Sequence, residues 1–275
     1  MLILILSLIS SLSAQNVQDL DRRLFMPRSL AMCGAMESRI NVNESLYYNP
    51  ASSAHTRMFS LDTGLDWDHD HSIPGRVDTY YVNAVDTDNE MFGGGFGYYK
   101  RNLGSLGSEW DMRGIFNKLL LDNRLGLGVG LHYTKFNHGL DRTSNMNADF
   151  GFLFLLTKKT LLGGTAYNLL GDNNGFNTRS IDLGIRHTMW DFFSATFDFE
   201  HLFKKKTTFT GALELLYRNG LMITISGQKN MLLDNIYWGM GLGYVGPKIS
   251  IIYGTMNAAT APYSFVNSFS LRVFF

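Results

Sequence analysis

The sequence predicts an all-β protein, a transmembrane antiparallel β-barrel of about fourteen strands with an N-terminal hatch segment in its lumen. Three observations predict the barrel. Units of about ten residues, in which apolar residues alternate with small or polar ones, repeat along the chain and are separated by short connectors. Only 17% of the 275 residues are charged, whereas the chain contains 28 Gly, 20 Phe, 13 Tyr and 4 Trp. Its last stretch, YSFVNSFSLRVFF, reads as a strand that closes on a terminal aromatic residue.

The alternation is clearest in IYWGMGLGY, residues 236–244. Every second residue from Ile236 to Tyr244 is apolar or aromatic, and the positions between them hold Tyr237 and three glycines. Residues 125–134 and 193–203 repeat the pattern, which places one face toward lipid and the other toward the lumen. The predicted strands span residues 58–67, 77–86, 91–100, 109–119, 124–135, 145–156, 161–170, 178–188, 192–203, 206–217, 220–228, 234–245, 247–256 and 263–275.

The connectors mostly alternate between longer loops such as DHDHSIPGR and KRNLGSLGS and tight turns such as LDN and RNG. In outer-membrane barrels the turns are periplasmic and the loops extracellular. A soluble β-sandwich also alternates, but its solvent face is rich in Lys and Glu. The non-apolar face here is mostly Gly, Ser, Thr and Asn, which favours a hydrated lumen. With 24 basic and 24 acidic side chains, the chain offers no electrostatic case for binding nucleic acid.

The N-terminal stretch MLILILSLISSLSA, residues 1–14, is interpreted as a secretory signal peptide because an apolar run ends in small residues. A buried strand or a membrane anchor is the alternative. Residues 15–57 do not alternate and are expected to form a hatch or plug segment, and residues 58–275 the barrel. We expect the protein in the bacterial outer membrane, in contact with its lipid. The terminal Phe275 resembles the signal that the barrel assembly machinery binds.

The segment RSLAMCGAMESRINVNESLYYNPASSA resembles the N-terminal pattern of FadL-type outer-membrane transporters and the related PorV-like barrels. In that family, R-[SG]-x-A-M-G-G-A is followed by a polar stretch and x-L-Y-x-N-P-A. Cys33 stands where the family has its first glycine, and Asn41 to Asn43 stand where an Asp pair is common. The positions that match are Arg28, Ala31, Met32, Gly34, Ala35, Leu46, Tyr47, Asn49, Pro50 and Ala51.

The resemblance implies a fourteen-strand barrel whose N-terminal segment folds into the lumen as a hatch. It also implies a channel for passive uptake of small, fatty-acid-like hydrophobic molecules, which leave through a lateral opening in the wall. The loops are short for a family that captures its ligand with long loops. A PorV-like accessory barrel that binds a secretion or surface-attachment protein is the alternative function, and a purely structural barrel is a third. Independently of the family, inward glycines at 126, 128, 130, 239, 241 and 243 leave space for a packed segment or a ligand.

The glycine run in MFGGGFGYYK, residues 91–100, lacks the spacing of a phosphate-binding loop. In a third strand, Gly93, Gly95 and Gly97 face inward, and Gly94 leaves a gap on the lipid face. Because glycine makes this stretch easily bent, these four residues are the candidate lateral opening. In FadL-type barrels the third strand kinks to open such a door. Close packing of the glycines against the hatch is the alternative.

Charged side chains expected in the lumen have mixed signs, so we expect a network that braces strands and plug rather than a relay for a substrate. The candidate network is Asp149, Asp182, Arg186, Asp198, Glu200 and Glu214, with Asp62, Asp66, Arg113, Lys248 and Arg272 also inward. Asp68 to His71 carry metal-ligand side chains but read as a solvated loop. The single cysteine, Cys33, reads as a small buried residue. No positioned nucleophile and base are evident, so we expect no enzyme, cofactor or metal.

Overall fold

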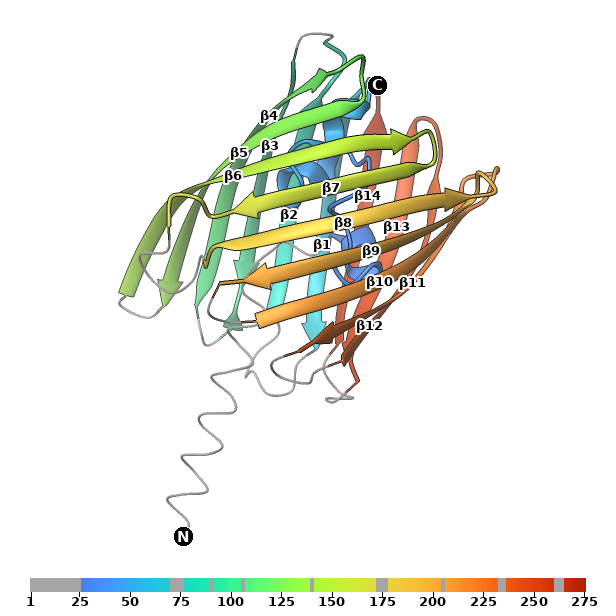
Figure 1. The fold of residues 1–275 in the computed structure, drawn as a ribbon. Helices are drawn as coiled ribbons and strands as arrows, with labels where there is room; N and C mark the ends of the chain where they lie inside the picture. The colour runs from blue at the N-terminus through green and yellow to red at the C-terminus, as the bar shows by residue number, and fades with distance from the viewer. Residues whose placement is uncertain are drawn as a thin grey trace.

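The computed structural model describes residues 26–69, 77–89, 92–104, 107–138, 141–171, 178–203, 206–231, 236–259 and 265–275. Fourteen antiparallel strands form a closed barrel in which each strand pairs with its neighbours in sequence and β1 pairs with β14 (Figure 1). The strands are β1 Phe59–His69, β2 Val77–Asp86, β3 Gly93–Asn102, β4 Ser108–Leu120, β5 Leu125–His138, β6 Asp141–Thr157, β7 Thr160–Tyr167, β8 Ser180–Met189, β9 Phe193–Leu202, β10 Lys206–Leu216, β11 Leu221–Asn230, β12 Ile236–Val245, β13 Ile249–Ala258 and β14 Phe265–Phe274.

The predicted strand number is confirmed, and so are the predicted faces of the strands except at Lys248. In β12, the five alternate residues from Ile236 to Tyr244 are exposed on the outside, and the glycines between them face inward. The same alternation leaves large apolar side chains on the outer surface of the other strands, among them Tyr80, Phe116 and Leu183. An outward apolar band over a polar interior is the distribution that a bilayer stabilises. No helix in the described parts of the chain is long and apolar enough to cross a membrane.

The two ends of the barrel differ. One end, called the turn end below, carries the short connections 121–124, 158–159 and 190–192. The other end, called the loop end, carries the connections that alternate with these along the chain, such as that between β3 and β4. Aromatic residues lie near both ends, with Trp67 and Trp110 toward the loop end and Trp190 in a turn. Phe275 closes the seam at the turn end, where its backbone N–H donates to the Phe59 carbonyl at 2.9 Å. One predicted inward residue is wrong: Lys248 is exposed beside the β12–β13 turn, because β13 begins only at Ile249.

Residues 26–57, called the inner segment below, lie inside the barrel (Figure 1). Nearly all of them are buried, although 55–57 approach the turn end and Arg57 is exposed. The segment contains only short helices, α2 Pro27–Ala31, η1 Asn43–Leu46 and η2 Ser52–His55. From α2 beneath β12–β14 it crosses the lumen to β7 and β8, and it ends beside β4 and β5.

Glycines on the inner face of the wall provide the room for this segment. A Cβ added at Gly128 would overlap Pro50, one at Gly241 would overlap Ala31, and one at Gly254 would overlap the Pro27 carbonyl. Comparable overlaps with inner-segment atoms arise at Gly97, Gly151, Gly163 and Gly239, and a Cβ at Gly126 would lie in tight contact with the Ala51 carbonyl oxygen, at 3.0 Å. The absent side chains let two backbones approach closely at points around the barrel.

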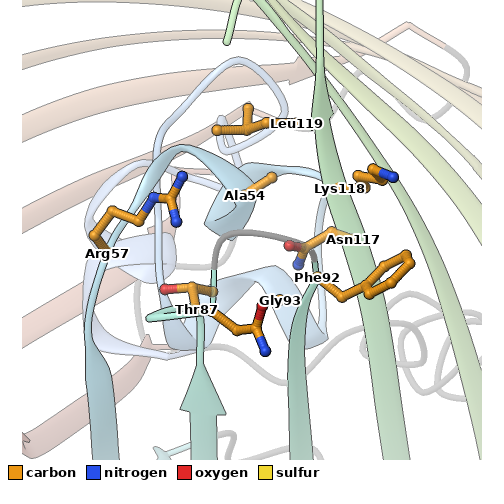
Figure 2. Close-up of a pocket in the computed structure, with 9 residues that line it drawn as sticks. Ala54, Arg57, Thr87, Phe92, Gly93, Asn117, Lys118 and Leu119 are labelled. Carbon is orange, nitrogen blue, oxygen red and sulfur yellow. The ribbon is translucent and has the colours of Figure 1, made fainter.

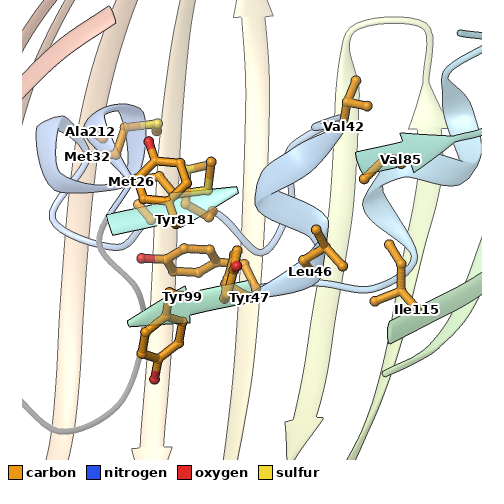
Figure 3. Packing of buried hydrophobic residues seen from close by; sticks show 13 residues of the cluster. Met26, Met32, Val42, Leu46, Tyr47, Tyr81, Val85, Tyr99, Ile115 and Ala212 are labelled. Carbon is orange, nitrogen blue, oxygen red and sulfur yellow. The ribbon is translucent and has the colours of Figure 1, made fainter. Parts of the chain in front are cut away.

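Apolar side chains of the inner segment and the wall form the largest buried cluster (Figure 3). Tyr47 packs against Tyr99 of β3, with ring centroids 6.0 Å apart, and both are nearly inaccessible to solvent. Each buried side chain of this size contributes about 1.5–3 kcal/mol through removal of apolar surface from water. The cluster comprises Met26, Met32, Ala35, Met36, Val42, Leu46, Tyr47, Tyr48, Tyr81, Val85, Tyr99, Ile115 and Ala212.

Gly254→Ala should destabilise the folded barrel, because its methyl group would collide with the Pro27 backbone. The expected loss is about 1–3 kcal/mol, the usual cost of overpacking. Gly211→Ala is the matched control, since no atom lies within 4 Å of a Cβ at that position. Urea unfolding in detergent micelles, followed by tryptophan fluorescence, measures both variants. Equal stability of the two variants would contradict close packing of the inner segment at Gly254.

Candidate functional site

The first half of the predicted hatch motif forms α2 and the turn that ends it. Gly34 has φ +87°, and its N–H donates to the Ser29 carbonyl at 2.8 Å, which closes the helix end. Cys33 has φ +47°, a left-handed conformation that favours glycine, so the cysteine stands at a position where glycine would be less strained. Burial raises the pKa of the Cys33 thiol to about 11. This thiol is therefore protonated at neutral pH. Met32 is fully buried in the apolar cluster.

Arg28 ties α2 to strand β10 of the wall. Its Nε and Nη2 atoms donate to the two carboxylate oxygens of Glu214 on β10, at 2.9 and 2.8 Å. Arg39, from the middle of the inner segment, donates its Nη2 to the same carboxylate. Bidentate guanidinium–carboxylate pairs fix geometry as well as charge. Breaking a buried pair on one side costs about 3–5 kcal/mol, because the partner charge is left uncompensated.

The second half of the motif fastens the inner segment to the wall through polar contacts. Asn49 Nδ2 donates to the carbonyls of Glu37 and Phe152, at 2.8 and 2.7 Å, and its Oδ1 accepts from the Ala51 N–H at 3.0 Å. One amide thus links two parts of the inner segment to β6. Pro50 follows it, and the Pro50 carbonyl accepts from Asn117 at 3.2 Å.

Leu46 and Tyr47 bring the motif to β2 and β3. The Tyr47 hydroxyl donates to Asn83 Oδ1 at 2.7 Å, and the Arg113 guanidinium lies 5.2 Å from the centroid of its ring. A Cβ at Gly97 would lie 2.8 Å from the Tyr47 hydroxyl and 3.1 Å from Leu46 Cδ1. Gly97 of the candidate lateral opening therefore packs against the inner segment.

Glu44 joins the inner segment to the seam of the barrel. Arg272 of β14 donates to Glu44 at 2.8 Å and to Asp62 of β1 at 2.9 Å. Burial alone would raise the pKa of Glu44, but the charges of Arg272 and Arg28 outweigh it and hold that pKa below the ordinary carboxyl value. Glu44 therefore stabilises the native state in its charged form.

The structure divides the six predicted network residues among different neighbourhoods. Glu214 pairs with Arg28 of the inner segment, and Arg186 lies close enough to Glu214 for their charges to interact. Asp198 accepts from the Glu37 N–H at 2.9 Å, whereas Asp182 and Glu200 face each other across β8 and β9. Asp149 lies apart, with its carboxylate 3.7 Å from His132 Nε2 and accepting from the Asn168 N–H at 2.8 Å.

The glycine run of β3 is paired on both sides. Gly94 to Asn102 pair with β2, and Gly93 to Asn102 pair with β4, without an interruption of register. A crevice opens where this pairing ends, beside Gly93 at the turn end (Figure 2). Inward Asn117 and outward Phe92 both line it, so it lies at the boundary between lumen and outer surface. It has room for about one water molecule. Its other lining residues are Ala54, Arg57, Thr87, Asn89, Lys118 and Leu119.

The fold matches solved structures over nearly the whole chain. The toluene transporter TbuX of Ralstonia pickettii aligns with 91% of this chain and 98% of its own, at 13% identity and a TM-score of 0.73. The toluene transporter TodX of P. putida aligns with 93% of this chain and 99% of its own, at 14% identity and a TM-score of 0.68. The chain has the FadL-type barrel fold. A Pseudomonas aeruginosa FadL homologue also aligns, over 93% of this chain and 99% of its own, at 10% identity and a TM-score of 0.62. No protein-family model and no curated protein matches the sequence.

Several residues of the site were not predicted from the sequence. Glu37, Arg39 and Glu44 lie in a stretch without periodicity, and their partners are far away in the chain. Glu37 accepts from the hydroxyls of Thr165 and Tyr167, at 2.6 and 2.7 Å. The density of polar residues between Glu37 and Ser45 was the available signal, because such residues need partners when they are buried. Within the described residues, no group of three or more His, Cys, Asp or Glu side chains is placed to hold a metal ion.

Glu44→Gln should weaken the attachment of the inner segment in a pH-dependent way. A carboxyl whose folded-state pKa is lowered adds stability that is present above its ordinary pKa of 4.5 and is lost as the pH falls through the folded-state value. The variant should therefore be less stable than the wild type by about 1–3 kcal/mol at pH 7, and the difference should shrink toward pH 3. Urea unfolding of both proteins at the two pH values measures it.

Asp191→Asn serves as the control, because Asp191 forms an exposed ion pair with Lys159 in the β8–β9 turn region. This variant should match the wild type at both pH values. A difference between wild type and Glu44→Gln that does not change with pH would contradict the assignment of a charged Glu44.

Proposed function

We propose that this protein is an outer-membrane channel through which small hydrophobic molecules enter the cell passively. The observation that carries the proposal is the filled fourteen-strand barrel, with an apolar outer surface and a tethered segment inside, in the fold of the toluene transporters TbuX and TodX. In this proposal the inner segment acts as the hatch. The turn end faces the periplasm and the loop end faces outward.

A hydrophobic solute gains little from a lumen that is lined by polar and charged side chains. Inward charges such as Asp62, Asp111 and Arg272 surround the inner segment on the wall, and together they make the direct path unfavourable for an apolar molecule. Exit through the side of the barrel returns the solute to lipid, where its transfer free energy is favourable. A lateral route therefore suits this interior better than an axial one.

The glycine run of β3 is the part of the wall that we propose opens. Gly93, Gly94, Gly95 and Gly97 can change backbone dihedrals at low steric cost. The crevice beside Gly93 and Asn117 marks the point from which the β3–β4 pairs would separate. In the structure, β3 pairs with β4 from Gly93 and with β2 from Gly94, and the crevice is too narrow for an aromatic ring, so the proposed opening requires strand separation.

Uptake of labelled toluene and of a labelled long-chain fatty acid tests the proposed function. The protein is produced in a bacterial host that lacks its own channel for hydrophobic solutes, and accumulation is compared with cells that carry an empty vector. Faster accumulation of either solute supports the proposal. Uptake at the vector level, with the barrel folded in the outer membrane, would overturn it. Stable capture of a secretion or surface-attachment protein would then favour the accessory barrel.

Gly94→Val should lower uptake without unfolding the barrel. A Cβ at Gly94 meets only the Ile115 carbonyl, at 3.5 Å, so the side chain fits, while the β-branched residue stiffens the strand. At Gly95 a Cβ would lie 2.8 Å from Val85 Cγ2, so the double Gly94→Val, Gly95→Val variant also strains the wall. Both variants are measured in the uptake assay.

Gly114→Val is the matched control on the neighbouring strand. A Cβ there lies 3.9 Å from the Gly95 carbonyl, and the residue also lies on the outer face. Loss of uptake in Gly94→Val with normal uptake in Gly114→Val is expected. Normal uptake in the double variant would restrict the role of the glycine run to packing against the inner segment.

A further inference from the structure

A buried cluster of cationic side chains lies between the inner segment and the wall of β8–β11. Three guanidinium groups, Arg28, Arg39 and Arg186, surround the single carboxylate of Glu214. Arg28 engages both of its oxygens, and Arg39 shares one of them. Among the ion pairs of the described residues, Glu214 is the partner of both Arg28 and Arg39. The group therefore carries more positive than negative charge.

Arg39 retains unused hydrogen-bond donors in this environment. Its side chain is 1% exposed, and its Nε and Nη1 atoms meet no acceptor in the described part of the chain. Arg186 Nε, on β8, is likewise buried without an acceptor among the described residues. A buried guanidinium with unmade hydrogen bonds is costly, and the cost falls when an acceptor of opposite charge is present.

Burial is the largest cause that lowers the pKa of Arg39, and repulsion from Arg28 and Arg186 adds to it. Glu214 opposes these effects, and the resulting pKa is about 9. Arg39 is therefore still protonated at neutral pH, and the positive charge that needs compensation is present under physiological conditions.

The wall around the cluster offers further hydroxyl donors. Thr196 lies directly opposite Arg186, and Thr224 lies directly opposite Glu214. The hydroxyls of both threonines and of Ser38 are buried without a hydrogen-bond partner among the described residues. Guanidinium and hydroxyl groups together form a donor set that suits an anion.

We infer that this cluster binds a small anion, a halide or the carboxylate of an organic acid, held by Arg39 and Arg186 between the inner segment and the wall. The anion compensates the excess charge and links the two parts of the molecule. Three further carboxylates lie toward the loop end, on Asp182, Asp198 and Glu200. The described ion pair of Arg39 is with Glu214, so the proposed anion is still needed to compensate the charge at Arg39. The inference does not depend on the proposed transport function.

Bromide identifies the site directly. Crystals of the full-length protein grown with sodium bromide should show an anomalous peak within hydrogen-bond distance of Arg39 or Arg186. A water molecule at this position both in these crystals and in parallel crystals grown with acetate would overturn the inference. Crystals grown with acetate in place of bromide test the carboxylate, which would appear as planar density at the same place.

Thermal unfolding measures the effect of the anion in solution. At constant ionic strength, replacement of isethionate, a sulfonate that is neither a halide nor a carboxylate, by bromide or acetate should raise Tm by about 5 °C near saturation, because the anion binds only the folded state. Dodecanoate at low concentration tests whether the carboxylate of an amphiphile occupies the same site. The anions that raise Tm show whether the site takes a halide, a small carboxylate or the carboxylate of an amphiphile, and no shift with any of the three would contradict the inference.

Arg186→Gln should remove the anion-dependent shift and leave the Arg28–Glu214 pair in place. Arg218→Gln, in the exposed turn after β10, loses the same charge and should keep the shift. Identical shifts in wild type and both variants would mean that the anions act elsewhere on the protein, and this result would contradict the inference.

Discussion

The interior of a fourteen-strand barrel is wider than its own side chains can fill, and this constraint governs the rest of the structure. Small barrels fill their interior with side chains, whereas larger ones enclose a channel or a plug. In this chain the inner segment fills the lumen, and glycines on the wall make room for it. Packing around the segment is therefore a backbone-to-backbone fit, and ion pairs such as Arg28–Glu214 fix its position.

Apolar packing and ion pairs hold the inner segment at different parts of the wall. The apolar cluster around Tyr47 lies toward β2–β4, whereas Glu214 holds the segment from the far wall on β10. Packing supplies most of the favourable free energy, because buried ion pairs offset much of their attraction through desolvation. The ion pairs instead specify one position out of many, since an uncompensated charge penalises any shift of the segment.

The strands were predictable from the sequence because alternation with a period of two reports directly on which face of a strand is buried. Even β2 and β4, where the alternation is weak, were placed close to their true positions. The predicted β6 was too short, because its first residues are polar and only their pairing with β5 from Asp141 onward makes them a strand. Polar strand ends that extend beyond the apolar band carry no hydrophobic signal.

The interior was less predictable. Arg28, Asn49 and Pro50 were singled out through a motif, but their partners Glu214, Phe152 and Asn117 could not be identified. An irregular segment has no period that fixes which side chain points where. The charge balance around Arg39 depends on residues 175 positions apart, a separation that only the three-dimensional course of the segment can bridge.

Arg272, on the last strand, joins two other parts of the chain, the inner segment through Glu44 and the first strand through Asp62. Without Arg272 at the seam, Glu44 and Asp62 would be two buried carboxylates with no shared cation. Closure of the barrel and seating of the inner segment therefore stabilise each other through this residue. A barrel closed without the inner segment would bury Arg272 with one carboxylate fewer, and this penalty disfavours an empty barrel.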